Sequence, residues 1–193
     1  MALKAIAING SPRHEGNTAA MLKDVLKVLS DGGVETELFQ AGGRMVKGCM
    51  ACAKCRENVG KCVTDDWINE LFPKMSAADA IIIGSPTYFS DMTPETKAVI
   101  DRTGFISRQG GNIFSRKIGA AVSAVRRAGG ITTLDSIQHF FLINDMIIPG
   151  SSYWNMSIAN QIGDYEKDKE GIRTMNRLGE NILWLMEKIK AGK

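Results

Sequence analysis

The 193-residue chain has no long hydrophobic run, only two histidines and a formal net charge of only +3. No apolar stretch approaches the roughly 20 residues that a membrane-spanning helix needs. The opening residues, MALKAIAIN, lack the extended apolar segment and the small-residue cleavage site of a secretory signal. Basic residues are spread along the chain instead of gathering on one segment. We therefore expect a cytoplasmic protein that neither binds nucleic acid nor enters a membrane.

The sequence also lacks the side-chain combinations of several common enzyme classes. No Ser/His/Asp or paired-carboxylate arrangement stands out, and neither His14 nor His139 has the setting of a general base. The G-x-G-x-x-G motif of dinucleotide sites and the Lys-Ser/Thr ending of triphosphate loops are both absent. These absences favour chemistry carried by a bound cofactor instead of by protein side chains.

Hydrophobic periodicity predicts a single domain, residues 1–193, in which strands alternate with helices. Such alternation indicates an α/β fold with a parallel sheet, helices on both faces and right-handed crossovers. Asp65 or Asp66 is expected to cap the second helix, and Thr93 the third, with Pro94 in its first turn. The predicted strands are 3–9, 34–40, 80–84, 117–125 and 146–148, and the predicted helices carry their apolar residues over 19–29, 67–75, 94–100, 131–142 and 172–189.

In such a sheet, ligands bind beyond the carboxyl ends of the strands. The loop after the first strand, NGSPRHEGNT at 9–18, offers hydroxyls at Ser11 and Thr18, a cation at Arg13 and an amide at Asn17. It leads into the amino end of a helix, where unpaired backbone N–H groups and the helix dipole favour an anion. A single phosphate fits this loop best. The alternative is that these residues only form a turn and cap the helix.

Two further loops follow strands at the same edge. The segment 85–93 places Tyr88 and Phe89 after a buried strand, with Pro86 stiffening the loop, so that a planar ring could rest there. The alternative is that these aromatics pack under the following helix. The segment 123–130 combines a serine, two arginines and two glycines, and the glycines would let backbone approach a ligand closely. Its alternative role is an ordinary turn with solvated arginines.

All four cysteines lie in one loop, residues 48–63, with the spacing Cys-x2-Cys-x2-Cys-x6-Cys. Structural disulfides explain them poorly in a chain without an export signal. Three thiolates spaced by two residues can wrap an iron-sulfur cluster, with a fourth arriving from further along the chain. Zinc is a second explanation, although structural zinc sites usually use two separated ligand pairs. Free thiols or a redox-active pair are the third. The residues concerned are Cys49, Cys52, Cys55 and Cys62.

Four motifs carry a resemblance that covers nearly the whole chain. They are NGSPRHEGNT, GCMACAKC at 48–55 followed by Cys62 and Asp65-Asp66, SPTYFSDMTPETKAVIDR at 85–102, and the Gly129-Gly130 turn. With them the chain resembles the NADPH-dependent FMN reductase-like family of flavodoxin-like proteins. Its cysteine loop is similar to that of the iron-sulfur flavoproteins within that group. The resemblance implies a three-layer α/β/α sandwich with a five-stranded parallel sheet in the order 2-1-3-4-5.

The resemblance also implies a set of cofactor residues. The first loop would hold the FMN phosphate, the second would meet the isoalloxazine ring, and the third would reach the ring from another side. The cysteines would hold a 4Fe–4S cluster. Ser90 and Asp91 stand where many relatives have a glycine. The implied FMN residues are Ser11, Arg13, Asn17 and Thr18 in the first loop, Pro86, Thr87, Tyr88 and Phe89 in the second, and Ser123, Arg126, Gly129 and Gly130 in the third.

The implied function is an FMN-dependent oxidoreductase or an electron-transfer flavoprotein. Its donor would be NAD(P)H or a protein, its other electron partner a small molecule or a ferredoxin-like protein, and its assembly a homodimer or homotetramer. Tyr153 and Trp154, expected just after the fifth strand, could cover the flavin or line a subunit contact, or simply pack at the strand end. The residues alone also allow a non-catalytic thiol redox sensor or a zinc-binding flavodoxin-like module.

Overall fold

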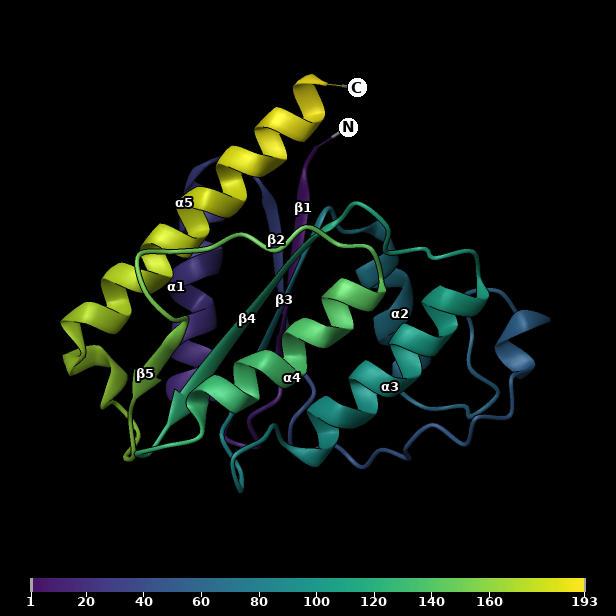
Figure 1. Ribbon diagram of the computed structural model, residues 1–193, viewed down its shortest axis with the longest axis horizontal. Helices are drawn as coiled ribbons and strands as arrows, with labels where there is room; N and C mark the ends of the chain where they lie inside the picture. The colour runs from purple at the N-terminus through teal and green to yellow at the C-terminus, as the bar shows by residue number, and fades with distance from the viewer. Residues whose placement is uncertain (1, 193) are drawn as a thin grey trace.

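The computed structural model describes residues 2–192 and has a parallel sheet of five strands between two layers of helices (Figure 1). The strand order is β2-β1-β3-β4-β5, which confirms the fold class and order implied by the resemblance. The strands are β1 (Lys4–Asn9), β2 (Glu35–Gln40), β3 (Ala80–Pro86), β4 (Ile118–Val125) and β5 (Met156–Ile158). The helices are α1 (Asn17–Asp31), α2 (Ile68–Ala77), α3 (Pro94–Gln109), α4 (Gly130–Ile143) and α5 (Lys169–Ala191), with short 3-10 turns η1 (Lys54–Arg56) and η2 (Tyr165–Lys167).

Alternate residues of the central strands face two separate cores. In β1, Ala5 and Ala7 belong to the core that includes α1 and α5. Ile6 and Ile8 belong to the core that includes α2, α3 and α4. Because both faces of β1 are buried, this strand reads as an unbroken apolar run in the sequence.

The predicted fifth strand is wrong. Within 146–148 only Ile147 pairs with the sheet, through an isolated bridge to Ile118. The chain then leaves the edge of β4 at Pro149 and Gly150 and returns at Met156 as β5, which pairs with the end of β4. Proline cannot donate a ladder hydrogen bond, so the apolar run cannot extend into a strand there. As a consequence Tyr153 and Trp154 precede β5 instead of following the fifth strand.

The predicted Thr93 cap is confirmed, whereas the N-cap residue of α2 is Trp67 instead of Asp65 or Asp66. The hydroxyl of Thr93 accepts a 3.3 Å hydrogen bond from the Thr96 amide, and Pro94 is the first residue of α3. At α2, Oδ1 of Asp66 accepts a 3.2 Å hydrogen bond from the Ile68 amide. Each side chain satisfies one of the unpaired N–H groups at a helix start.

Since every strand pair is parallel, the loops that follow β1, β2, β3 and β4 leave the sheet at one edge. In Figure 1 these loops lie at the bottom of the view, and the segment after β2 passes on to η1 at the far right. Within residues 2–192, no helix is long and apolar enough to cross a membrane.

Candidate functional site

The loop between β1 and α1 has the form expected of an anion site. Ser11 and Thr18 are buried, whereas Arg13 is exposed at the outer side of the loop. Helix α1 starts after Gly16, and no side chain caps it by a hydrogen bond. Its first backbone N–H groups therefore remain available to an anion, which the helix dipole also attracts.

A pair of amide side chains that the sequence prediction missed, buried Asn9 and half-buried Gln40, holds this loop. The Asn9 side chain donates a 2.7 Å hydrogen bond to Oε1 of Gln40, and its own oxygen accepts from the Ser11 amide at 3.1 Å. Nε2 of Gln40 donates to the carbonyl oxygen of Ser11 at 2.7 Å. Asn9 and Gln40 are the terminal residues of two paired strands and stand opposite each other in register. No sequence motif marks Asn9 and Gln40, and only the predicted pairing of the first two strands could have brought them together.

Two glycines allow the close backbone approach in this region. A Cβ on Gly42 would lie 2.2 Å from the carbonyl carbon of Ser11. A Cβ on Gly10 would lie 1.8 Å from the hydroxyl oxygen of Thr96. The loops after β1 and β2 and the start of α3 therefore meet without room for a side chain at either position.

The Asn17 side chain is bonded to a segment outside the first loop. Its Nδ2 donates a 2.8 Å hydrogen bond to the carbonyl oxygen of Gln161, and its Oδ1 accepts from the Tyr165 amide at 3.2 Å. Its side chain thus fixes the segment after β5 against the start of α1. The sequence prediction missed this fourth loop because it placed the fifth strand too early.

The second loop presents two aromatic side chains on a strained turn. Tyr88 and Asp91 exchange backbone hydrogen bonds of 2.7 and 3.0 Å across this turn. Both central residues are left-handed, with φ of +48° at Phe89 and +65° at Ser90. The Phe89 side chain is fully exposed and Tyr88 is 45% exposed, so neither packs under the following helix. Left-handed backbone at non-glycine residues is costly and gathers at functional sites.

The third loop lies directly against the second. The hydroxyl oxygen of Thr87 is 3.0 Å from those of Ser123 and Thr133. Gly129 is left-handed, and a Cβ there would come within 2.8 Å of the Ser90 Cα. The buried Ser123 hydroxyl thus holds the Thr87 side chain in place by a hydrogen bond. Of the other implied residues, Arg126 is exposed, Pro86 is half-buried and Gly130 is buried as the first residue of α4.

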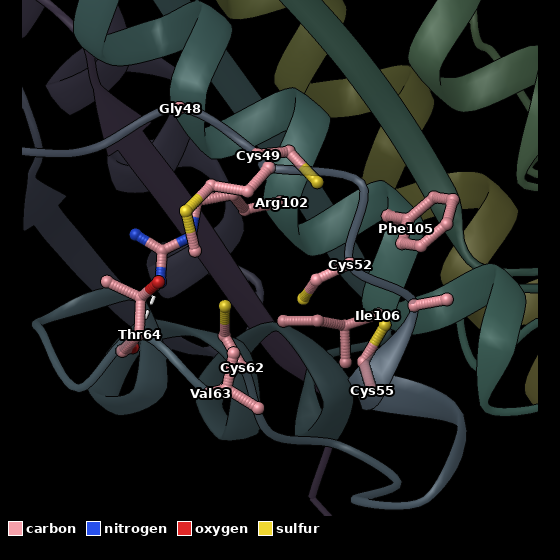
Figure 2. Close-up of a pocket in the computed structure, with 12 residues that line it drawn as sticks. Gly48, Cys49, Cys52, Cys55, Cys62, Val63, Thr64, Arg102, Phe105 and Ile106 are labelled. Atoms are coloured by element: carbon pink, nitrogen blue, oxygen red, sulfur yellow. Dashed lines mark hydrogen bonds between the residues drawn. The ribbon is translucent and has the colours of Figure 1, made fainter.

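The four cysteines line one pocket beside α3, as Figure 2 shows. Cys49 and Cys52 are exposed, Cys62 is half-buried and Cys55 is buried. Burial raises the pKa of the Cys55 thiol, and the other three cysteines add to this rise. The loop therefore brings all four predicted ligands around one space.

The pocket has a donor set suited to a cluster but little free volume. Its enclosed part measures about 20 Å³, which is roughly the room of one water molecule. Across residues 2–192, no three Cys, His, Asp or Glu side chains are grouped closely enough to hold one metal ion.

A buried arginine forms another wall of this pocket. Arg102, on α3, is only 2% exposed, and its guanidinium donates to Asp66 and, at 3.2 Å, to the carbonyl oxygen of Thr64. Burial alone would lower the pKa of Arg102, but its hydrogen bond to Asp66 and its interaction with the neighbouring Cys62 raise the pKa above its ordinary value. Arg102 is the last residue of the third motif, 85–102, but no sequence pattern predicted its place in this pocket.

Comparison with known proteins agrees with this arrangement. A family model described as NADPH-dependent FMN reductase matches residues 3–161. An iron-sulfur flavoprotein from Methanocaldococcus jannaschii is 35% identical over 194 residues, covering 97% of this chain and 100% of that protein. An iron-sulfur flavoprotein from Methanosarcina thermophila is 30% identical over 199 residues, covering 99% of each chain.

Solved structures show the same architecture. A flavodoxin, WrbA-like protein from Agrobacterium tumefaciens superposes with a TM-score of 0.65 at 14% identity, covering 97% of this chain and 99% of that one. At this identity the likeness concerns the fold alone.

Proposed function

The chain belongs to the NADPH-dependent FMN reductase family and is an FMN-dependent oxidoreductase. We propose that its cysteine loop also carries an iron-sulfur cluster. The observation that carries the proposal is the gathering of all four cysteines of the chain around one pocket. We propose that the protein couples a two-electron flavin to a one-electron centre.

The FMN phosphate would bind at the start of α1. The uncapped helix N-terminus after Gly16 supports this placement, with the Ser11 hydroxyl and Arg13 beside it. Asn17 would act indirectly by holding the 161–165 segment, because its side chain is already bonded there. Thr18 is buried in the first turn of α1 and would contribute its backbone N–H.

The flavin ring would lie over the second and third loops. Pro86, Thr87, Tyr88 and Phe89 would face the ring from one side, and the turn at Gly129 and Gly130 would let backbone approach it. Ser123 would act through Thr87, whose hydroxyl it supports. When bound, FMN supplies the redox chemistry, while these residues hold the ring and keep water from one face.

The four thiols suit a cluster better than a zinc ion. Structural zinc sites usually use two separated ligand pairs, whereas this loop offers three closely spaced cysteines and one further along the chain. A cluster binds its thiolates to different irons, so its ligands lie further apart. Cys49, Cys52, Cys55 and Cys62 are the proposed ligands.

The proposed partners follow from the family and from the exposed aromatic side chains. The donor would be NAD(P)H or a protein, and the one-electron partner a small molecule or a ferredoxin-like protein. We propose a homodimer or homotetramer in which the exposed Tyr88 and Phe89 help a neighbouring subunit cover the flavin. Four free cysteines fit the reducing cytoplasm.

Oxygen-free purification tests the proposal. We expect one FMN per chain, together with iron and acid-labile sulfide that fall sharply in Cys55→Ser while FMN stays at one per chain. Ala53→Ser, an exchange in the same loop that removes no thiol, is the control and should keep its iron. Zinc without iron would favour the zinc-binding module. Thiol-dependent changes in assembly without iron or NAD(P)H oxidation would favour the redox sensor.

A further inference from the structure

An ion pair between two helices closes one side of the cysteine pocket. Arg102 on α3 lines the pocket, and its guanidinium is bound to the carboxylate of Asp66 at the start of α2. The arginine side chain is 1% exposed and the aspartate side chain 19% exposed. Figure 2 shows the guanidinium on the side of the pocket where Thr64 and Cys62 lie. A fixed positive charge therefore stands next to a proposed ligand.

Loop anchoring explains only part of this arrangement. The guanidinium donates to the carbonyl oxygens of Lys47 at 3.4 Å and Thr64 at 3.2 Å, and so holds both ends of the cysteine loop. Its Nε, in contrast, is buried and has no hydrogen-bond partner among residues 2–192. An unpaired buried donor is costly. Because the Arg102 Nε lies in the pocket wall, we infer that its acceptor belongs to the group that the four cysteines bind.

We propose that Arg102 and Asp66 set the charge balance of the cysteine site in opposite directions. The guanidinium favours the more negatively charged state of a group held by Cys62 and its neighbours, and the Asp66 carboxylate opposes it. This inference rests on the proposed function, since it concerns the cluster. One-electron reduction adds one negative charge from an external reductant and needs no proton or bond change at either residue. Because burial weakens solvent screening, both charges act strongly on that step.

The test uses two variants of one ion pair on the full-length holoprotein. Arg102→Met keeps the apolar stem but removes the positive charge, leaving Asp66 unopposed. Asp66→Asn removes the negative charge, and its side-chain oxygen can still accept from the Ile68 amide. Midpoint potentials of the cluster are measured by dithionite titration with mediators and followed by electron paramagnetic resonance. Iron, sulfide and FMN content are recorded for each variant.

We expect the potential to fall in Arg102→Met and to rise in Asp66→Asn. Asp65→Asn is the matched control, because it makes the same charge change on an exposed side chain one residue away, and its shift should be much smaller. Arg102→Lys should restore most of the potential lost in Arg102→Met. A purely structural role predicts loss of cluster in both ion-pair variants, with no opposite shifts. Shifts of the same sign, or none, would overturn the inference.

The design separates this inference from the proposed function. If wild-type protein prepared without oxygen holds no iron, the proposed function fails. If the wild-type protein holds a cluster but its midpoint potential is the same in Arg102→Met and Asp66→Asn, only the inference fails. A loss of FMN in Arg102→Met would show that this variant does not fold. In that case Asp66→Asn and Arg102→Lys decide the inference. It then requires a raised midpoint potential in Asp66→Asn and a near-normal midpoint potential in Arg102→Lys.

Discussion

The hydroxyl of Thr93 donates a 2.8 Å hydrogen bond to the backbone carbonyl of Gly10, which lies 83 positions earlier in the chain. The same oxygen accepts from the Thr96 amide, so one side chain caps α3 and ties the first loop to the second. The amide of Gly10 in turn donates to the carbonyl of Gly84 at 2.8 Å. The two proposed halves of the flavin site are therefore built as one rigid edge.

Thr93→Val should weaken both folding and FMN binding. Valine keeps the volume but leaves the Gly10 carbonyl and the start of α3 without their partner, at a cost of about 1–3 kcal/mol in unfolding free energy. Urea unfolding measures the stability, and quenching of flavin fluorescence measures the dissociation constant. Thr93→Ser is the control, because it retains the hydroxyl. Equal FMN affinity in all three proteins would contradict the coupling of the loops.

Gly42→Ala should damage the phosphate loop. The new Cβ would fall 2.2 Å from the Ser11 carbonyl carbon, and backbone cannot yield as the end of a side chain can. We expect the FMN dissociation constant to rise about tenfold or more, a loss of about 1.4 kcal/mol. Gly150→Ala is the control, because nothing lies within 4 Å of its Cβ position. The proposed phosphate site is wrong if the two variants bind FMN equally well.

The sequence predicted the parts of this fold that depend on local pattern. Strands β1, β3 and β4 are buried on both faces, so their apolar runs were plain. Strand β5 was misplaced because three residues carry no usable periodicity and a more apolar run stood ten residues earlier. Pairing with the end of β4, a contact distant in sequence, decides which run becomes the strand.

The candidate site was predictable to a similar extent. Motifs placed the three loops and the cysteines, but they could not tell contact residues from supporting ones. Asn17 and Ser123 look like ligand residues in the sequence, yet their side chains bond to other parts of the protein. Conversely, Asn9 and Gln40 meet only through strand register, and Arg102 reaches the cysteine pocket only through the packing of α3. Long-range packing, not residue type, assigns these roles.

Tyr165→Phe should change how stability depends on pH. The Tyr165 hydroxyl donates a 2.6 Å hydrogen bond to Asp24, and burial, with Asp24 beside it, raises the tyrosine pKa well above its ordinary value. The unfolded chain therefore loses this proton first, so wild-type stability is fully present below about pH 10 and falls above it. In the phenylalanine variant we expect an unfolding free energy lower by about 1 kcal/mol at pH 8.

Urea midpoints between pH 8 and 11 measure this effect. Wild type should lose more stability over that range than Tyr165→Phe, so the two curves converge. Tyr88 and Tyr153, the other tyrosines of the chain, are present in both proteins and cancel in the difference. Parallel curves would show that the pKa of Tyr165 is the same in the folded and unfolded chain.

Phe89→Gly and Ser90→Gly separate backbone strain from aromatic contact at the second loop. Both positions are left-handed, so glycine at either should stabilise the protein by up to about 1 kcal/mol. Only the first exchange removes the exposed ring that is proposed to contact the flavin or a neighbouring subunit. We expect Phe89→Gly to raise the FMN dissociation constant about three- to tenfold, in keeping with the loss of one aromatic contact, whereas Ser90→Gly leaves it unchanged.

Fluorescence titration gives the affinities, and light scattering shows whether the subunit assembly weakens in Phe89→Gly alone. If both variants bind FMN and assemble as wild type does, the exposed ring has neither role and the strain at this turn needs another explanation.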